Sequence, residues 1–253
     1  MPRSVRFAVA VAGVATLLLS SSAAIGTAAA PTGPDVTSTS PAPGDVVGVA
    51  APVTVTFAEP VRSRHAAERS ISFRSGASPL TPAGTFSWLR DDVVQWTPTD
   101  FWPAHSTITL LAGGDGFSTS FETGSAVVGV ADLDAHTFTV SIDGQVARQM
   151  PASMGKPKFP TPIGTFSALE KQDVVVMDSR TIGIPLSDPE GYKLTVYDAV
   201  RVTWGGVYVY GAPWSTASQG NSNVSHGCIN LSPDNADWYY NTVHVGDPII
   251  VQA

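Results

Sequence analysis

One residue of this chain is well suited to nucleophilic chemistry, the single cysteine Cys228, which stands in the segment Ser225-His226-Gly227-Cys228-Ile229-Asn230. A thiol becomes an effective nucleophile when a nearby base or a positive field converts it to the thiolate. His226 could be that base, and Gly227 permits an unusual backbone angle or the close approach of a substrate. The segment indicates a catalytic cysteine. A His near a Cys is a weak signal by itself, and a small buried apolar residue is the structural alternative.

Metal binding is the other chemistry that these residue types allow, and the sequence supports it poorly. There is no second cysteine, and no closely spaced histidine completes a usual set of ligands. The remaining histidines are scattered, and we expect each to be structural or exposed: His65, His105, His136 and His244. We expect neither a metal nor a cofactor.

The composition limits the class of protein. The chain has 253 residues, a formal net charge of −7 and only 14% charged residues. This argues against nucleic-acid binding, which needs a basic face. One cysteine cannot form an intramolecular disulfide, and in an exported protein it indicates intermolecular pairing or a reactive thiol. Low charge with many Gly, Pro, Ser and Thr residues favours a β-rich extracellular protein.

The first thirty residues have the pattern of a secretory signal peptide. Two arginines precede residue 7, residues 7–19 are almost entirely apolar, and Ala28 and Ala30 supply an A-x-A arrangement. The apolar run is short for a membrane span, which needs about 20 residues, and an uncleaved signal anchor is the alternative. We therefore expect an exported protein, secreted or held by that anchor. Residues 31–44, rich in Pro, Ser, Thr and Gly, are interpreted as a linker.

Residues 45–124 are predicted to form an immunoglobulin-like domain. Apolar and polar residues alternate there in short runs, as in half-buried strands. The runs cover residues 53–57, 71–73, 93–96, 107–111 and 119–121. Several short strands separated by turn residues suggest an immunoglobulin-like sandwich, and we expect Trp88, Trp96 and Trp102 to serve its core.

Residues 125–253 are predicted to form a second, mostly β domain with one short helix. Residues 137–142 and 145–150 flank Asp143-Gly144, a pair that suits a two-residue type I′ hairpin. Further strands are expected at residues 164–168, 174–177, 200–203, 207–210 and 248–251. The helix is expected from Pro233 to about Val243, with Ser232 as its cap and Asp234 near the positive end of its dipole. The predicted fold class is mainly β throughout.

The cysteine segment resembles the S/T-H-G-C-x-N signature of L,D-transpeptidases, whose catalytic domain is of the YkuD type. Other segments of the second domain resemble this family as well: Gly155-Lys156, residues 160–166 (PTPIGTF), residues 212–215 (APWS), Gln219-Gly220, and Asn230 followed by the Ser232-Pro233 helix start. The resemblance covers about 125 residues, to the C-terminus. A preceding immunoglobulin-like domain is similar to that of actinobacterial members.

The resemblance implies acyl transfer between peptidoglycan stem peptides, with no metal or cofactor. Cys228 would attack the carbonyl of the third residue of a donor tetrapeptide, D-alanine would leave, and an acceptor amine would take the acyl group from the thioester, giving a 3→3 cross-link. Backbone N–H groups of Gly227 and Cys228 would stabilise the oxyanion. The resemblance further implies that Tyr192 lines the site and donates to the oxyanion, that Met177, Trp214 and Asn230 form the substrate cleft, and that His226 and Ser225 orient the loop. Carbapenem-type β-lactams are the inhibitors it implies, and the cell wall or periplasmic space is the location it implies.

One position departs from the family pattern. Members usually carry a general-base histidine eighteen residues before the cysteine, and here Tyr210 occupies that position, followed by Gly211 where a small polar residue is common. A tyrosine, with an ordinary pKa near 10, is a weak base at neutral pH and carries no positive charge. Either His226 or another group replaces the base, or the chain is a degenerate member that binds stem peptides without cross-linking them. A third reading is a structural wall protein that acts through its immunoglobulin-like part.

Overall fold

The computed structural model describes residues 33–114 and 116–253. The predicted signal peptide lies outside these residues. Within them, no helix is both long and apolar enough to cross a membrane.

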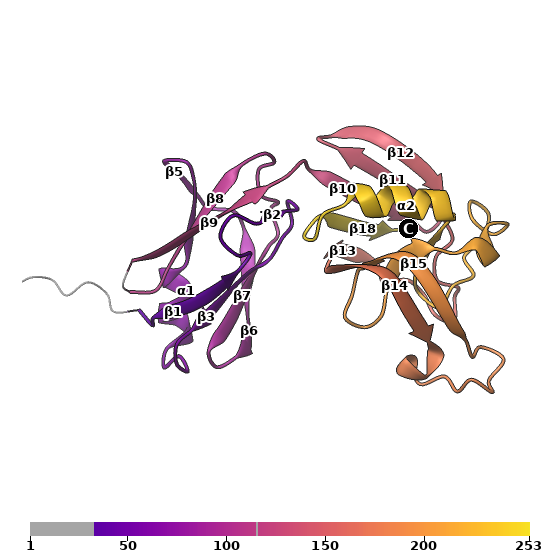
Figure 1. Ribbon diagram of the computed structural model, residues 1–253, viewed down its shortest axis with the longest axis horizontal. Coiled ribbons are helices and arrows are strands. Elements are labelled where there is room, and N and C mark those ends of the chain that lie inside the picture. The colour runs from indigo at the N-terminus through magenta and orange to yellow at the C-terminus, as the bar shows by residue number, and fades with distance from the viewer. Residues whose placement is uncertain (1–32, 115) are drawn as a thin grey trace, which may run out of the picture. The chain divides into compact units, whose positions relative to one another are not determined.

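The first domain is a sandwich of two sheets, as predicted from the alternating runs (Figure 1). One sheet has the strand order β1 (Val36–Ser40), β3 (Val53–Phe57), β7 (Val93–Pro98) and β6 (Gly84–Arg90). The other has the order β2 (Val46–Val47), β9 (Phe117–Thr123), β8 (Thr107–Ala112), β4 (Ser72–Ser75) and β5 (Ser78–Leu80).

Aromatic side chains fill the space between these sheets. Trp96 and Trp102 are buried, and their ring centroids lie 5.1 Å apart. Trp88 is only partly buried but packs against the same core. The prediction that these three tryptophans serve the core is therefore confirmed.

Five elements of the first domain were not predicted from the sequence: the strands β1, β2, β5 and β6, and the helix α1. Strand β1 lies within residues 31–44 and pairs antiparallel with β3, so the linker interpretation is wrong for Val36–Ser40. Its hydroxyl-bearing sequence, VTSTS, looks like a spacer because the strand stands at the edge of its sheet and buries little. A short helix, α1 (Arg64–Ser70), is capped by the side chain of Ser63, and its mostly polar sequence gave no helical pattern.

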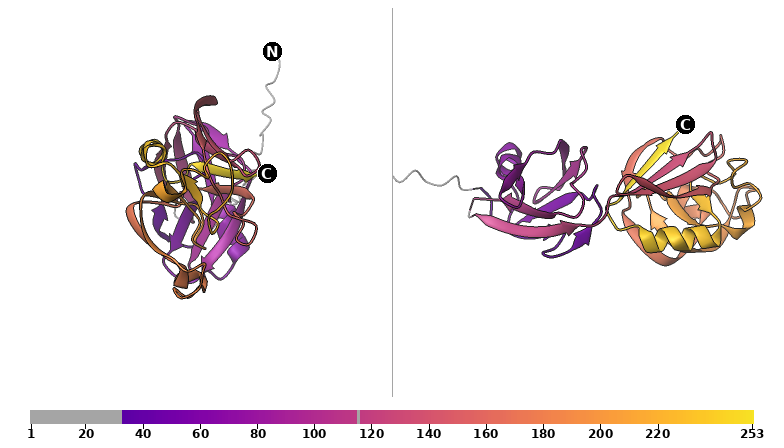
Figure 2. Two further views of the ribbon diagram at one scale, coloured as in Figure 1. Left: turned by 90° about the vertical axis from the view of Figure 1, so that its right-hand side faces the viewer. Right: turned by 90° about the horizontal axis from the view of Figure 1, so that it is seen from above.

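The second domain has two further sheets and a helix. One sheet has the order β12 (Gln145–Pro151), β11 (Thr137–Ile142), β10 (Val127–Asp132), β18 (Pro248–Gln252) and β13 (Gly164–Ser167). The other has the order β14 (Glu170–Asp178), β15 (Lys193–Arg201), β16 (Tyr208–Gly211) and β17 (Ile229–Leu231). Helix α2 (Pro233–Thr242) packs against β15 and β16 and lies along one side of the strands (Figure 2).

The predicted turn and the predicted helix start of this domain are confirmed, whereas the strands β10 and β17 were not predicted. The hairpin of β11 and β12 turns at Asp143 and Gly144, both with positive φ (49° and 81°), as a type I′ turn requires. Helix α2 begins at Pro233 with Asp234 in its first turn. Ser232 occupies the N-cap position, but its side chain makes no capping hydrogen bond, so that part of the prediction is wrong.

A single hydrophobic core joins both sheets and α2. Phe138 of β11 meets Tyr239 of α2 edge to face, with ring centroids 4.8 Å apart, and Val200, Val209 and Ile229 of the second sheet belong to the same buried cluster. The opposite face of that sheet carries a smaller cluster around Tyr208 and Tyr210, against which Cys228 packs. The core therefore fixes β16 and β17, and Cys228, immediately before β17, lies on the side of the sheet that carries the smaller cluster.

Candidate active site

Cys228 lines a pocket of about 170 Å³ together with almost every residue that the sequence singled out. The predicted residues on its wall are Met177, Tyr192, Tyr210, Trp214, Ser225, His226, Cys228 and Asn230. Gly227 does not line the pocket. The structure thus brings together residues from β14, from β15 and the segment just before it, from β16, from η2 (Pro213–Ser215), and from β17 and the loop before it.

The loop that carries Cys228 is closed by the Ser225 side chain. Ser225 Oγ donates to the carbonyl oxygen of Cys228 at 2.6 Å and accepts the N–H of Gly227 at 3.1 Å. Gly227 has φ +113°, a conformation that side chains rarely adopt. The turn places Cys228 immediately before β17, which runs parallel to β16.

Two earlier segments of the chain hold this loop in place through hydrogen bonds. The buried Thr161 hydroxyl donates to the carbonyl of Gly227 and accepts the N–H of Gly155, both at 2.9 Å. The N–H of Lys156 donates to the carbonyl of Ser225 at 3.0 Å. The Gly155-Lys156 and Pro160-Thr161-Pro162 segments therefore have a physical role here, since they hold the cysteine loop in its turn.

The environment of the thiol opposes its ionisation. Burial raises the pKa of the Cys228 thiol to about 11, although a hydrogen bond from the Tyr208 backbone acts in the other direction. Its Sγ lies 3.5 Å from the carbonyl oxygen of Gly206, to which the S–H can donate. The free protein therefore holds a thiol at neutral pH, and a reaction needs a group that takes up its proton.

Tyr210 is not suited to that task. It projects from β16 and is 6% exposed. Burial, reinforced by the nearby Cys228, raises the pKa of its phenol far above the ordinary value, so Tyr210 remains a neutral phenol. The following residue, Gly211, faces α2, and a Cβ there would lie 3.3 Å from Pro233 Cα, which explains why only a small residue fits.

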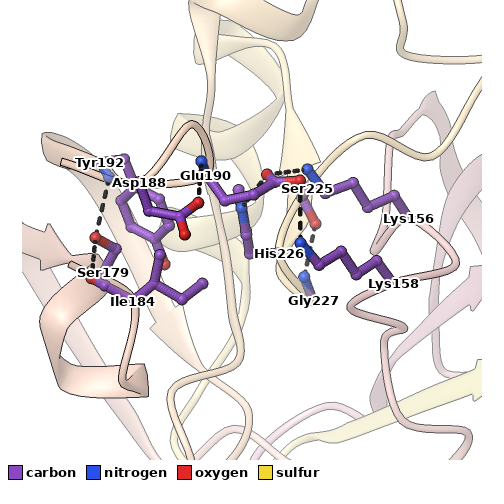
Figure 3. A network of polar contacts seen from close by, with 10 residues as sticks. All are labelled: Lys156, Lys158, Ser179, Ile184, Asp188, Glu190, Tyr192, Ser225, His226 and Gly227. Atoms are coloured by element: carbon purple, nitrogen blue, oxygen red, sulfur yellow. Dashed lines mark hydrogen bonds and ion pairs between the residues drawn. The ribbon is translucent and has the colours of Figure 1, made fainter. Parts of the chain in front are cut away.

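His226 is held in a network of charged groups (Figure 3). Its Nε2 is 2.9 Å from Oε2 of Glu190, and the same carboxylate oxygen accepts a hydrogen bond from Lys156 Nζ. Lys158 Nζ approaches the other carboxylate oxygen at 3.9 Å. Lys156 first, and His226 after it, lower the pKa of Glu190, so its carboxylate stays ionised.

Tyr192 and Trp214 form other parts of the pocket wall. Burial raises the pKa of Tyr192, with the nearby Cys228 as the next cause, so its hydroxyl remains available as a hydrogen-bond donor. Trp214 is 51% exposed, and its ring centroid lies 6.2 Å from that of Tyr210. The pocket therefore has an exposed aromatic surface on which part of a ligand could rest.

Asn230 lies deeper, where its Nδ2 donates to Ser215 Oγ at 3.2 Å. The amide of Gln219 donates to the same hydroxyl. Among the residues that the structure describes, none is hydrogen-bonded to the buried Oδ1 of Asn230. Asn230 therefore lines the pocket, while its side-chain oxygen is itself buried.

Several residues of the site were missed by sequence reasoning. Leu194 and Val224 line the pocket, and Glu190 contacts His226. Leu194 lies on β15, where the sequence predicted a strand only from residue 200 onward. Glu190 follows Pro189 in a segment without periodicity, and a lone acidic residue there gives no signal of its partner.

In the part of the chain that the structure describes, no group of three or more His, Cys, Asp or Glu side chains is arranged to hold a metal ion. The residues around Cys228 can instead supply a nucleophile, an imidazole, and hydroxyl and amide groups. Such a set suits acyl transfer through a covalent intermediate.

Comparison with known proteins agrees with this chemistry. The L,D-transpeptidase catalytic domain model matches residues 126–251, and the bacterial Ig domain model matches residues 10–118. The chain is 54% identical to L,D-transpeptidase 1 of Mycobacterium tuberculosis, with 99% of each sequence covered. An L,D-transpeptidase structure from Mycobacterium smegmatis is 70% identical, with a TM-score of 0.82, and the match covers 88% of this chain and 100% of that chain. The structure of an L,D-transpeptidase in complex with imipenem is 57% identical, with a TM-score of 0.79, covering 87% and 99%.

These matches confirm the predicted fold class, a mainly β chain with an immunoglobulin-like domain followed by a YkuD-type domain. The identity extends over nearly the whole sequence and includes the domain that carries the cysteine pocket. The chain therefore belongs to the L,D-transpeptidase family and carries its catalytic domain.

Proposed function

We propose that this L,D-transpeptidase forms 3→3 cross-links between peptidoglycan stem peptides through a thioester on Cys228. The Cys228 thiolate attacks the carbonyl of the third residue of a donor tetrapeptide, and the amide bond to the terminal D-alanine breaks as its nitrogen takes a proton. The side-chain amine of a neighbouring stem then attacks the thioester, and its proton returns to the sulfur. The observation that carries this proposal is the pocket in which Cys228 and His226 lie with the aromatic and amide residues of the cleft.

His226 is the group that we propose as proton acceptor in place of the usual histidine. An imidazole has an ordinary pKa near 6.5 and serves as a base at neutral pH, whereas Tyr210 has a raised pKa and carries no charge there. His226 lines the same pocket as the thiol. Proton transfer from Cys228 to this imidazole would form a thiolate beside an imidazolium, and each charge would stabilise the other.

The developing oxyanion needs hydrogen-bond donors. We propose the Cys228 backbone N–H and the Tyr192 hydroxyl, because the Gly227 N–H already donates to Ser225 Oγ. Removing one such donor costs about 3 kcal/mol of transition-state stabilisation in other enzymes. For the Gly227 N–H to donate to the oxyanion as well, its hydrogen bond to Ser225 Oγ would have to break during the reaction.

The second candidate function is a degenerate member that binds stem peptides without cross-linking them. Two observations favour it: the phenol of Tyr210 at the usual base position, and the raised thiol pKa of about 11. Both lower the thiolate population of the free protein. The cleft with its exposed Trp214 would serve binding equally well.

Carbapenem-type β-lactams are the proposed inhibitors, because a relative that is 57% identical has been solved in complex with imipenem. Such a compound would acylate Cys228 in the same way as a donor peptide. We further propose that the chain acts outside the cytoplasmic membrane, secreted or held by an anchor, since residues 1–30 have the signal pattern and the substrate lies in the wall.

The deciding experiment is intact-mass analysis of the protein after incubation with disaccharide-tetrapeptide muropeptides, with Cys228→Ala as the control. A cross-linked dimer or a thioester adduct on the parent, absent from Cys228→Ala, is the expected result. Retained muropeptide binding without any adduct or dimer would establish the binding protein instead. Mass spectrometric fragmentation of the dimer then decides whether the link joins third residues.

A further inference from the structure

Residues 179–192, between β14 and β15, form a loop that is held together by hydrogen bonds among its own residues and is called the braced loop below (Figure 3). The Ser179 N–H donates to the carbonyl of Tyr192 at 2.9 Å, its carbonyl accepts the N–H of Ile184 at 3.0 Å, and its hydroxyl accepts the N–H of Tyr192 at 3.0 Å. Asp188 accepts the N–H of Glu190 with its side chain at 2.8 Å. These bonds tie the loop to the end of β14, and from this loop Tyr192 lines the pocket while Glu190 contacts His226.

Glu190 is the point at which this loop meets the cysteine loop. One of its carboxylate oxygens contacts both His226 Nε2, at 2.9 Å, and Lys156 Nζ. The Glu190 side chain is 25% exposed and that of His226 is 19% exposed, so the contact is partly shielded from solvent. The carboxylate therefore links three segments that are far apart in the sequence.

The imidazole plane is fixed at the same time. The rings of Phe159 and Tyr192 lie 4.8 Å and 4.9 Å from the His226 ring, measured between centroids. Two aromatic contacts limit the tilt of the imidazole, but neither of them distinguishes one ring nitrogen from the other. Among the residues that the structure describes, the hydrogen bond to Glu190 is the contact that distinguishes them.

We infer that Glu190 is a positioning residue that fixes the tautomer and orientation of His226 for its reaction with Cys228. An ionised carboxylate can only accept hydrogen bonds, so Nε2 must carry the proton and Nδ1 is left as the nitrogen that accepts one. When Nδ1 takes the thiol proton, the resulting imidazolium gains a charge-assisted bond to Glu190. This role rests on the proposed function of His226 as base.

The charges around the pair are consistent with this role. Lys156 and Lys158 face Glu190 from the segment after β12, Tyr192 faces His226 from the braced loop, and Cys228 follows His226 on the cysteine loop. Lys156 is the main cause of the lowered Glu190 pKa. The carboxylate thus stays ionised and ready to accept from Nε2 throughout the neutral range.

Two measurements on Glu190→Gln test the inference, since this variant keeps the side-chain length and removes the charge. The first is long-range ¹H–¹⁵N NMR of protein with ¹⁵N-labelled histidine, recorded at a pH where imidazoles are neutral. It reports which ring nitrogen of His226 carries the proton, and the signal that is missing from the spectrum of His226→Gln identifies this residue. We expect a single Nε2–H tautomer in the parent and a mixture in Glu190→Gln, because an amide can either donate or accept. We also expect the acylation of Cys228 by imipenem to slow at least about tenfold, as for loss of a bond to a charged group.

Two variants serve as controls. Glu170→Gln removes a carboxylate paired with Arg201 at 2.9 Å, away from the pocket wall, and its acylation rate should stay within about twofold of the parent. Lys156→Gln removes the neighbouring cation but keeps the carboxylate, so the tautomer should not change. If Glu190 were only a structural bridge, Lys156→Gln and Glu190→Gln would disturb the imidazole alike.

The outcomes separate this inference from the proposed function. Suppose that Glu190→Gln changes the tautomer of His226 but imipenem does not acylate the parent protein. This result would uphold the positioning role of Glu190 and reject His226 as an effective base. An unchanged tautomer would overturn the inference whatever the activity. So would an unchanged acylation rate in a parent that does react.

Discussion

Replacing Tyr210 by histidine should accelerate the acylation of Cys228. The substitution puts an imidazole at a position that lines the pocket beside the thiol and is 6% exposed. An imidazolium there would stabilise the thiolate, and cysteines next to His⁺ reach pKa values of about 3.5 to 7.5. The phenol of Tyr210 offers no such charge.

The size of the effect follows from the thiol pKa of about 11. At pH 7 that value leaves about one molecule in 10⁴ as thiolate, whereas a pKa of about 7 leaves about half. The less basic thiolate is also a weaker nucleophile, and a Brønsted coefficient of about 0.45 over four units reduces the rate about sixtyfold. The net expectation is an increase in the acylation rate of about a hundredfold at pH 7. This factor is smaller to the extent that proton transfer to His226 already raises the thiolate population of the parent.

The assay is the rate of acyl-enzyme formation with imipenem, followed by intact mass or rapid-mixing fluorescence over a range of pH. The parent rate should climb steeply with pH through the neutral range, and the Tyr210→His rate should level off. Tyr210→Phe is the matched control, since it removes only the hydroxyl and should behave like the parent. Equal rates for the parent and Tyr210→His at pH 7, with both folded, would refute the argument that a raised thiol pKa limits this protein.

Three further substitutions test other parts of the structure. Thr161→Val should lower the free energy of unfolding by about 2–4 kcal/mol, because it leaves a backbone N–H and a buried carbonyl without their hydrogen bonds. Urea denaturation measures this change. A loss below about 0.5 kcal/mol, the smallest net value of one such bond, would contradict the prediction. Burial raises the pKa of Asp247, so its native form holds a proton that the unfolded chain has lost and stability should fall as pH rises above about 4. Asp247→Asn should flatten this part of the profile of melting temperature against pH, and an unaltered slope would argue against it. Gly211→Val should destabilise by about 1–3 kcal/mol through overlap with α2, where a Cβ would already lie 3.4 Å from that of Ala236, while Gly211→Ser should cost much less in the same thermal unfolding assay.

The sequence predicted well wherever a local pattern decides the structure. Alternation located most of the strands of both domains, and the Asp143-Gly144 turn and the Pro233 helix start were visible because backbone preferences of single residues determine them. Strand β1 was missed because an edge strand with one weakly apolar face has the composition of a spacer.

The site was predictable in its members but not in its connections. The family resemblance pointed to Cys228, His226 and the cleft residues, and these do line one pocket. The contact between Glu190 and His226 spans 36 residues and joins two loops. Only the tertiary structure brings such groups together, so no local signal announces them.

The hydrogen bonds of Thr161 also determine at which stage of folding the loop around Cys228 can take its native shape. Its hydrogen bond to Gly227 joins residues 66 positions apart, and contacts of such long range form only after distant parts of the chain have met. A fragment that begins after residue 161 would contain the whole Ser225–Asn230 sequence and yet lack the bonds that shape its turn. The thiol environment is therefore a product of the completed domain, and the reactive geometry should disappear together with the native state rather than persist in a partly folded chain.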